Sequence, residues 1–256
     1  MAFLETDTPD FRLLASVSPL RKPLGATLLD DITGPGEFEE LCWHYLRSLP
    51  IEIKLGQIKT RLVSEHSEAE TRAEGPGGGP RLEFDSYLFS GNIPVGQLMV
   101  SLYRQPGGDP DEIYLELEQS QIWKPELRNQ GLGRAIIENV QMLGRKLQAQ
   151  AITLFAMYDG RFAWPSLGFK FGDYLPEPGR AMRYRRAFRR YCRRYGVEPP
   201  AMQDWDAPDF ARFISSTKIE SLTGHWLDQP RRYQQVELGR AFMLSRRPFF
   251  LCLPLE

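Results

Sequence analysis

The sequence predicts an α+β fold in which helices pack beside a sheet, and three segments carry this prediction. Between residues 112 and 147, apolar residues first alternate, as in a half-buried strand, and then recur at helical spacing after a glycine-containing turn. A mostly apolar run over 151–157 has the composition of another strand. Residues 81–103 contain two strand-like runs around a Ser-Gly-Asn turn, which predicts an antiparallel hairpin.

The composition is that of an ordinary globular protein with one elaborated domain. The chain has 256 residues, of which 42% are hydrophobic and 25% charged, and its formal net charge is −1. It contains no apolar run of membrane-spanning length, and its first residues do not resemble an export signal. Cys42, Cys192 and Cys252 are widely spaced, and the three histidines are isolated, so a disulfide framework or a metal site lacks support. We therefore expect a cytoplasmic protein without a bound metal.

The segments before the hairpin differ in character. Residues 1–34 contain prolines and glycines without a sustained period, so we expect an irregular N-terminal arm before a domain that covers 35–256. Residues 37–49 predict an amphipathic helix, and 51–63 fit either a strand or a second helix. The run GPGGGP at 75–80 predicts a flexible loop.

The turn before the predicted central helix favours anion binding. It reads R-N-Q-G-L-G-R over 128–134, which places Gly131 and Gly133 at the helix N-terminus. Unpaired N–H groups and the positive end of the helix dipole attract phosphate there, and glycine lets the backbone approach closely. A dinucleotide-binding fingerprint would need a third glycine where Ile136 stands, and a P-loop would need Gly-Lys-Ser/Thr. Glycines that serve only tight packing remain the alternative.

Two motifs in this region resemble those of a known superfamily. The pattern R-x-x-G-x-G at 128–133, after the strand exit I-x-x-P-E at 122–126, closely resembles motif A of the GCN5-related N-acetyltransferase (GNAT) superfamily. The Leu-Gly-Phe at 167–169 then aligns without a gap with a second motif of that superfamily. The resemblance covers roughly residues 82–175.

The resemblance implies a mixed, mostly antiparallel sheet flanked by helices. A minimal GNAT domain would return promptly with a last strand, yet the best candidate for that strand is at 248–255. We expect residues 176–247 to form a helical insertion before this strand and to overhang the substrate cleft.

The resemblance also implies an acyl-CoA-dependent N-acyltransferase, in the simplest case an N-acetyltransferase that moves an acetyl group from acetyl-CoA to an amine of unknown identity. The turn would hold the pyrophosphate of acetyl-CoA, and backbone N–H groups of the preceding strand would polarise the thioester oxygen. The expected cofactor-binding residues are Ile122, Trp123, Arg128, Asn129, Gln130, Gly131, Leu132, Gly133 and Arg134.

Acyl transfer to an amine also needs a base, because a free alkylamine is mostly protonated at neutral pH. Glu118, or failing that Glu116, is the expected base, since the two lie two residues apart on one strand and share a face. An acidic surface or a salt bridge to an arginine-rich helix is the alternative. The tyrosine acid of many GNAT enzymes is replaced by Trp164, which cannot serve as a general acid, so Tyr174 and Tyr158 become the candidate acids.

Residues 180–194 predict a helix that carries eight arginines and no acidic residue. This helix fits a solvated cationic face or a docking surface for RNA, for an acidic protein or for the 3′-phosphate of the cofactor. Two further functions therefore stay open. One is a non-catalytic GNAT-fold module that binds acyl-CoA or has a regulatory role. The other is an acetyltransferase that acts on aminoacyl-tRNA or on a protein docked by this helix.

Overall fold

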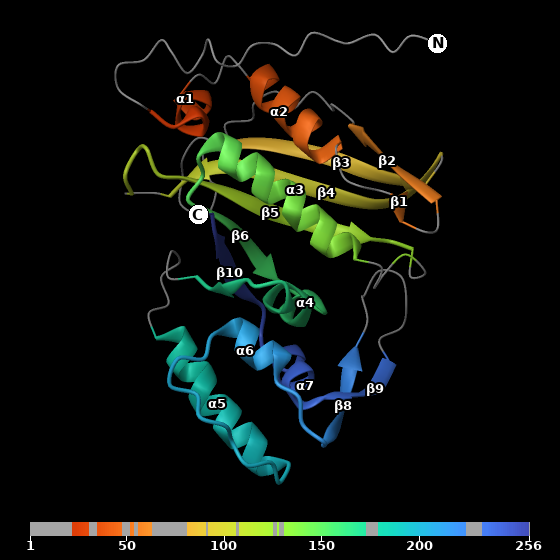
Figure 1. The fold of residues 1–256 in the computed structure, drawn as a ribbon, viewed down its shortest axis with the longest axis vertical. Coiled ribbons are helices and arrows are strands. Elements are labelled where there is room, and N and C mark those ends of the chain that lie inside the picture. The colour runs from red at the N-terminus through yellow and green to blue at the C-terminus, as the bar shows by residue number, and fades with distance from the viewer. Residues whose placement is uncertain are drawn as a thin grey trace.

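The fold is built on one large mixed sheet (Figure 1). Its eight strands lie in the order β1-β2-β3-β4-β5-β6-β10-β7, and all neighbours are antiparallel except β5 and β6, which are parallel. This mostly antiparallel sheet flanked by helices confirms the predicted fold class. The computed structural model describes residues 22–30, 35–47, 52–53, 56–62, 81–90, 92–105, 108–124, 127, 131–172, 179–223 and 232–255.

The elements follow one another as α1 (Leu24–Asp30), α2 (Pro35–Arg47), β1 (Glu52–Ile53), β2 (Gly56–Leu62), β3 (Arg81–Ser90), β4 (Ile93–Arg104), β5 (Ile113–Ile122), α3 (Leu132–Leu147), β6 (Ala151–Ala156), α4 (Gly160–Ser166), β7 (Lys170–Phe171), α5 (Arg180–Arg194), α6 (Ala207–Arg212), β8 (Lys218–Thr223), β9 (Arg232–Glu237), α7 (Leu238–Leu244) and β10 (Phe249–Pro254). The predicted helix over 37–49, the hairpin and the last strand are thereby confirmed, and 51–63 contains strands. The glycine-rich loop predicted at 75–80 lies outside the described residues.

Helices α1, α2 and α3 cover one face of the sheet (Figure 1). Side chains point alternately to the two faces of a strand, so Leu98, Val100 and Leu102 of β4 point toward these helices, where they are at most 1% exposed. On α3, the apolar residues that recur at helical spacing form the matching buried stripe, as predicted. The opposite face of β3, β4 and β5 carries most of the polar side chains discussed below.

The N-terminal segment expected to be irregular contains helix α1. This helix is fixed to the sheet by Arg104, whose guanidinium bonds Asp30 Oδ1 at 2.6 Å and the carbonyl oxygen of Ala26 at 2.8 Å. Gly25 packs so closely against Ile113 that a Cβ would overlap with that side chain. The helix has only seven residues, too few for a recognisable apolar period, so the sequence did not predict it.

The insertion between β7 and β10 is not entirely helical. Helices α5, α6 and α7 occur as expected in kind, but β8 and β9 form a separate antiparallel pair between them. Helices α6 and α7 pack against α4, whereas α5 packs against α7 at the end of the molecule remote from α3 (Figure 1). Helix α5 therefore does not overhang the glycine-containing turn, and its arginines are not neighbours of the predicted phosphate site.

Cys42, Cys192 and Cys252 are buried free thiols. Within the described ranges, no helix combines the length and the apolar character needed to cross a bilayer.

Candidate active site

Strands β5 and β6 separate soon after they begin. Their parallel ladder joins only Tyr114–Glu116 to Ala151–Thr153, yet β5 continues to Ile122 and β6 continues to Ala156. On its far edge β6 remains paired with β10 along its whole length. The second half of β5 therefore presents to the β6 side a strand edge that β6 does not pair. Such an edge can bind an extended ligand through its backbone groups.

A β-bulge on β5 accompanies the separation. Leu117 lies opposite Val100 of β4, and Gln119 lies opposite Met99, so Glu118 is an extra residue without a partner on β4. A bulge bends its strand and increases the local twist. The bend falls two residues beyond Glu116, the last residue paired with β6. The bulge therefore explains why β5 turns away from β6 at this point.

The start of α3 has the geometry of an open anion site. Gly131 caps the helix with φ 83° and ψ 0°, a left-handed conformation that favours glycine. The amide of Ala135 makes the first helical hydrogen bond, to the Gly131 carbonyl oxygen at 3.0 Å, so the preceding amides of Leu132, Gly133 and Arg134 lack intrahelical acceptors.

The two glycines are not explained by tight packing. Among the described residues, a Cβ built on Gly131 would meet no atom within 4 Å, and one on Gly133 would meet only Leu167 Cδ1, at 3.8 Å. Close packing against the described residues therefore does not require glycine at either position.

The strand that leads to this turn supplies fewer backbone donors than expected. The amide of Trp123 donates to the Val95 carbonyl oxygen of β4 at 2.7 Å, so it is removed from the donors expected for a thioester oxygen. Peptide groups alternate in direction along an antiparallel ladder, so those of Ile122 and Ser120 point to the opposite edge, the side of β6. Arg128, Asn129, Gln130 and Tyr174 lie outside the described residues.

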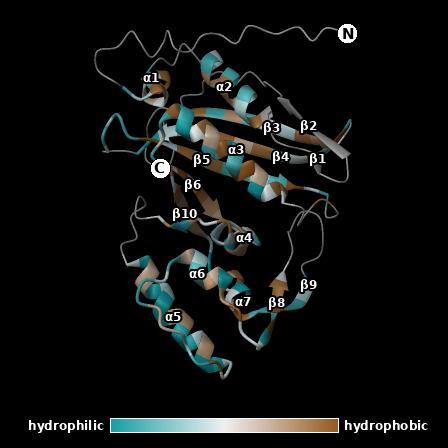
Figure 2. Cartoon of the chain, viewed as in Figure 1, coloured by the Kyte–Doolittle hydropathy of each residue, from teal (hydrophilic) through white to brown (hydrophobic). Residues whose placement is uncertain are grey.

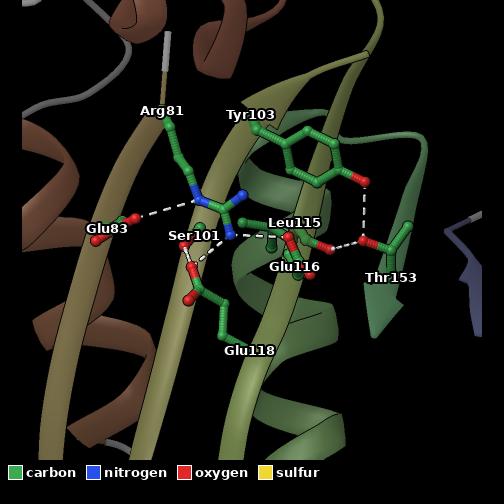
Figure 3. A network of polar contacts seen from close by, with 8 residues as sticks. All are labelled: Arg81, Glu83, Ser101, Tyr103, Leu115, Glu116, Glu118 and Thr153. Carbon is green, nitrogen blue, oxygen red and sulfur yellow. Dashed lines mark hydrogen bonds and ion pairs between the residues drawn. The ribbon is translucent and has the colours of Figure 1, made fainter. Parts of the chain in front are cut away.

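A network of charged groups lies at the other end of the β5 segment that β6 does not pair (Figure 3). Arg81 extends from β3 across β4, and its Nη2 bonds Glu116 Oε2 at 2.8 Å and also bonds Glu118. Ser101 of β4 donates a second hydrogen bond to Glu118, and Arg81 Nε lies 3.4 Å from Glu83 Oε1. Glu116 and Glu118 thus share a face, as predicted. Their cationic partner is Arg81, however, and not the arginine-rich helix.

The environment of Glu116 alters its acidity. Burial raises the pKa of Glu116 because it disfavours the carboxylate, and the negative charges of Glu118 and Glu83 add to this effect. The positive charge and the hydrogen bond of Arg81 oppose it. Side-chain exposure is 12% for Glu116 and 24% for Glu118, so Glu118 is the more accessible of the two.

Tyr103 of β4 and Thr153 of β6 extend the network to β6, at the point where β5 and β6 separate. Their hydroxyl groups lie 2.9 Å apart, and Thr153 also donates to the Leu115 carbonyl oxygen at 3.3 Å (Figure 3). Burial raises the pKa of Tyr103 to about 12, so its hydroxyl stays protonated at neutral pH. Tyr103 is therefore a weaker acid than an ordinary tyrosine.

Sequence reasoning missed five members of this network: Arg81, Glu83, Ser101, Tyr103 and Thr153. They come from three strands and join the carboxylates only through the pairing of the sheet. The one available signal was the alternation of the hairpin, which puts polar positions 101 and 103 on the same side of β4.

The residue at the position of the usual GNAT tyrosine is a packing residue. Trp164 lies in the short helix α4 and stacks edge-to-face on Phe169, with ring centroids 6.0 Å apart. A Cβ on Gly160 would approach Trp164 Nε1 to 2.8 Å, which shows how closely the indole is held. Tyr158 lies in the turn before α4 with φ 48°, where its carbonyl oxygen accepts from Arg161 Nε at 2.9 Å.

We expect the substitution Arg81→Met to destabilise the fold by about 3–5 kcal/mol, because it leaves two largely buried carboxylates without their cation. Urea unfolding monitored by circular dichroism measures this change. Arg81→Lys keeps a positive charge and should recover part of the loss. A melt of Arg81→Met that matches the wild type would contradict the assigned role of the ion pairs.

Comparisons with known structures find similarity to GNAT acetyltransferases. Arabidopsis thaliana Naa50, in complex with a bisubstrate analogue, is 17% identical over 35% of this chain and 58% of its own, with a TM-score of 0.29. A tandem GNAT protein from the clavulanic acid biosynthesis pathway is 19% identical over 57% of this chain and 42% of its own, with a TM-score of 0.30. A protein from Desulfovibrio desulfuricans assigned to the GNAT family is 11% identical over 68% of this chain and 69% of its own, with a TM-score of 0.27.

The chain spans 58% and 42% of the length of the first two structures, so their activities are statements about those proteins. No model of a protein family matches the sequence, and neither does any curated protein. The chain's own geometry defines the class: a sheet with one parallel pair that separates, a glycine-led helix after the first strand of that pair, and a last strand between β6 and β7. This is a GNAT-type fold.

Proposed function

We propose that the protein is an acyl-CoA-dependent N-acetyltransferase. The observation that carries this proposal is the segment of β5 that β6 does not pair, which has the glycine-led start of α3 beyond one end and the Glu116–Glu118 pair at the other. From Glu118 to Ile122 the strand rises by about 13 Å. A suitable ligand is therefore long and thin, anionic at one end and reactive at the other. Acetyl-CoA has this form.

In this proposal the pyrophosphate binds to the amides of Leu132, Gly133 and Arg134, where the helix dipole favours negative charge. The acyl-bearing arm extends along β5 toward the point where β5 and β6 separate. Arg128, Asn129 and Gln130 stay predicted ligands of the pyrophosphate. The exposed Arg134 adds a positive charge at the helix start.

The reaction proposed is direct transfer. The nitrogen of the acceptor amine attacks the thioester carbon, a carboxylate accepts the proton of that nitrogen, and the carbon–sulfur bond breaks to release coenzyme A. Glu118 is the first candidate for the base, since it sits on the bulge and is the more exposed carboxylate. Glu116 is the second, because burial raises its pKa. Tyr174 stays the predicted source of the proton for the leaving thiolate.

The position of Trp164 supports a second candidate function. Because this indole is packed against Phe169 and cannot act as an acid, a GNAT-fold module that binds acyl-CoA without transferring the acyl group is a coherent alternative. Both functions require binding of acyl-CoA, but only the transferase transfers the acyl group to an amine.

The test is release of free thiol from acetyl-CoA in the presence of a panel of primary amines, including a polyamine, an amino sugar and a peptide with a free N-terminus. Accelerated release with at least one amine, and formation of the acetylated product by mass spectrometry, is the expected result. Saturable acetyl-CoA binding without turnover of any amine would favour the non-catalytic module. Absence of both would overturn the proposal.

A further inference from the structure

Helix α5 presents two chemically different faces (Figure 2). Its inner face carries Phe188 and Cys192, which are fully buried, beside the half-buried Tyr184 and Tyr191. The outer face carries exposed arginines at positions that recur every three or four residues and therefore lie on one side of the helix. We call these residues the arginine stripe: Arg183, Arg186, Arg189, Arg190, Arg193 and Arg194.

Aromatic packing fixes the direction in which the stripe points. The ring of Tyr184 lies 4.4 Å from that of Phe171, and the ring of Phe188 lies 4.8 Å from that of Phe242, both measured between centroids. Tyr191 also contacts Phe242, at 5.4 Å. Contacts of this kind contribute beyond the area that they bury and restrict rotation of the helix. The arginines are consequently presented on a rigid support.

Neighbouring arginines of the stripe repel one another. Among the described residues, no carboxylate lies within ion-pair distance of Arg186, Arg189, Arg190 or Arg193. Like charges spaced by three or four residues destabilise a helix by roughly 0.2–0.5 kcal/mol per pair, and an ordinary solvated face intersperses acidic residues to avoid this cost. The neighbouring Arg246 adds to the concentration of charge: burial lowers its pKa, and the charge of Arg190 lowers it further. An anionic partner would offset the repulsion.

The chemistry of the stripe narrows the class of anionic partner that it can bind. Every cation on α5 is an arginine, whose planar fork matches phosphate oxygens, and the aromatic residues of the helix face inward, so none offers a stacking platform for unpaired bases. Met182, at 49% exposed, is the only large apolar side chain that α5 exposes, which is too little to insert into a membrane.

The packing of α5 also decides how it can meet a nucleic acid. Its inner face is covered by the protein, so only its arginine-bearing side can contact a nucleic acid. It can lie along a ridge of phosphates. Duplex RNA is recognised mainly through its shape and its backbone, and its narrow major groove brings two phosphate rows close together. We propose that the arginine stripe is a docking surface for the phosphate backbone of duplex RNA.

This surface is separate from the candidate active site, because α5 lies at the end of the molecule remote from α3 (Figure 1). The proposal therefore stands independently of the proposed acetyl transfer. Binding of acetyl-CoA should be the same in variants of the stripe and in the wild type, which a calorimetric titration of each protein checks.

The experiment measures fluorescence anisotropy of a labelled 20-base-pair RNA duplex titrated with the full chain at 50 to 200 mM KCl. The test variant is Arg186→Gln with Arg190→Gln, and the control is Arg145→Gln with Arg232→Gln, two exposed arginines of α3 and β9. The affinity of the test variant should fall about tenfold. The slope of log Kd against log salt should decrease by roughly 0.9 for each arginine neutralised. The control should match the wild type.

Three results would overturn the proposal. The first is no salt-dependent binding of the RNA duplex at 50 mM KCl. The second is an equal loss of affinity in the test and control variants. The third is displacement of the RNA by poly-L-glutamate, or by a DNA duplex of the same sequence, at an equal concentration of charge; either would identify a surface that reads charge alone. Circular dichroism of each variant establishes that the fold is retained.

Discussion

Replacing Gly131 with aspartate is expected to abolish acetyl-CoA binding, with a loss of at least about a hundredfold in affinity, or roughly 2.7 kcal/mol. The new carboxylate would lie at the N-terminus of α3, in the open space where the pyrophosphate is proposed to bind. It would be stabilised there by the same amides and the same helix dipole, and it would repel the ligand. Titration calorimetry with acetyl-CoA measures the effect.

A matched control separates charge from shape. Gly131→Asn introduces a side chain of the same size without the charge, and asparagine tolerates the left-handed conformation that φ 83° requires. No atom of the described residues lies within 4 Å of its Cβ, so packing against them is undisturbed. We expect Gly131→Asn to bind acetyl-CoA far more tightly than Gly131→Asp. Equal affinities for the wild type and Gly131→Asp would show that the anion binds elsewhere.

Removing the proposed base is expected to have the second largest effect. Glu118→Gln should lower kcat by about a hundredfold or more, because the general base supplies 10²–10⁴-fold in typical enzymes. If Glu116 is the base, Glu116→Gln should show that loss instead. Glu83→Gln is the control, since it removes a carboxylate near Arg81 without changing β5. Wild-type rates in both β5 variants would place the base elsewhere.

The dependence of the rate on pH tests whether Glu116 is the base. A base works only when it is deprotonated, so the rate rises with pH through the pKa of the residue. Burial raises the pKa of Glu116, and the charge and hydrogen bond of Arg81 oppose that rise. Arg81→Lys, whose shorter side chain does not reach the position of Nη2, should therefore move the acidic limb to higher pH if Glu116 is the base. Profiles of kcat/KM for the wild type and Arg81→Lys test this. An unmoved acidic limb would exclude Glu116.

Much of the fold follows from local periodicity in the sequence. The boundaries of α5 agree with the predicted 180–194, and α3 agrees with its apolar stripe, because long amphipathic helices repeat their pattern over several turns. Short elements carried no such signal: α1 and the β8–β9 pair were not predicted. The position of α5 was also predicted wrongly. An amphipathic pattern shows which face of a helix is buried, but it does not show against which part of the protein that face packs.

The parts of the site that depend on residues close together in the sequence were predictable. The parts that depend on the pairing of strands were not. Glu116 and Glu118 were placed on one face from their spacing, and both do contact Arg81. The bulge at Glu118 and the hydrogen bond from Trp123 to Val95 are properties of the pairing between β4 and β5. Arg81 itself lies 35 residues before Glu116 in the chain, and only the register of three strands brings the two together.

A crystal structure of the protein with acetyl-CoA is the most direct test of the proposed function. The pyrophosphate oxygens are expected at about 3 Å from the amide nitrogens of Leu132, Gly133 and Arg134, and the thioester is expected beside β5, on the side of β6 and next to Glu118. Coenzyme A bound away from the start of α3, with the edge of β5 unoccupied, would contradict it.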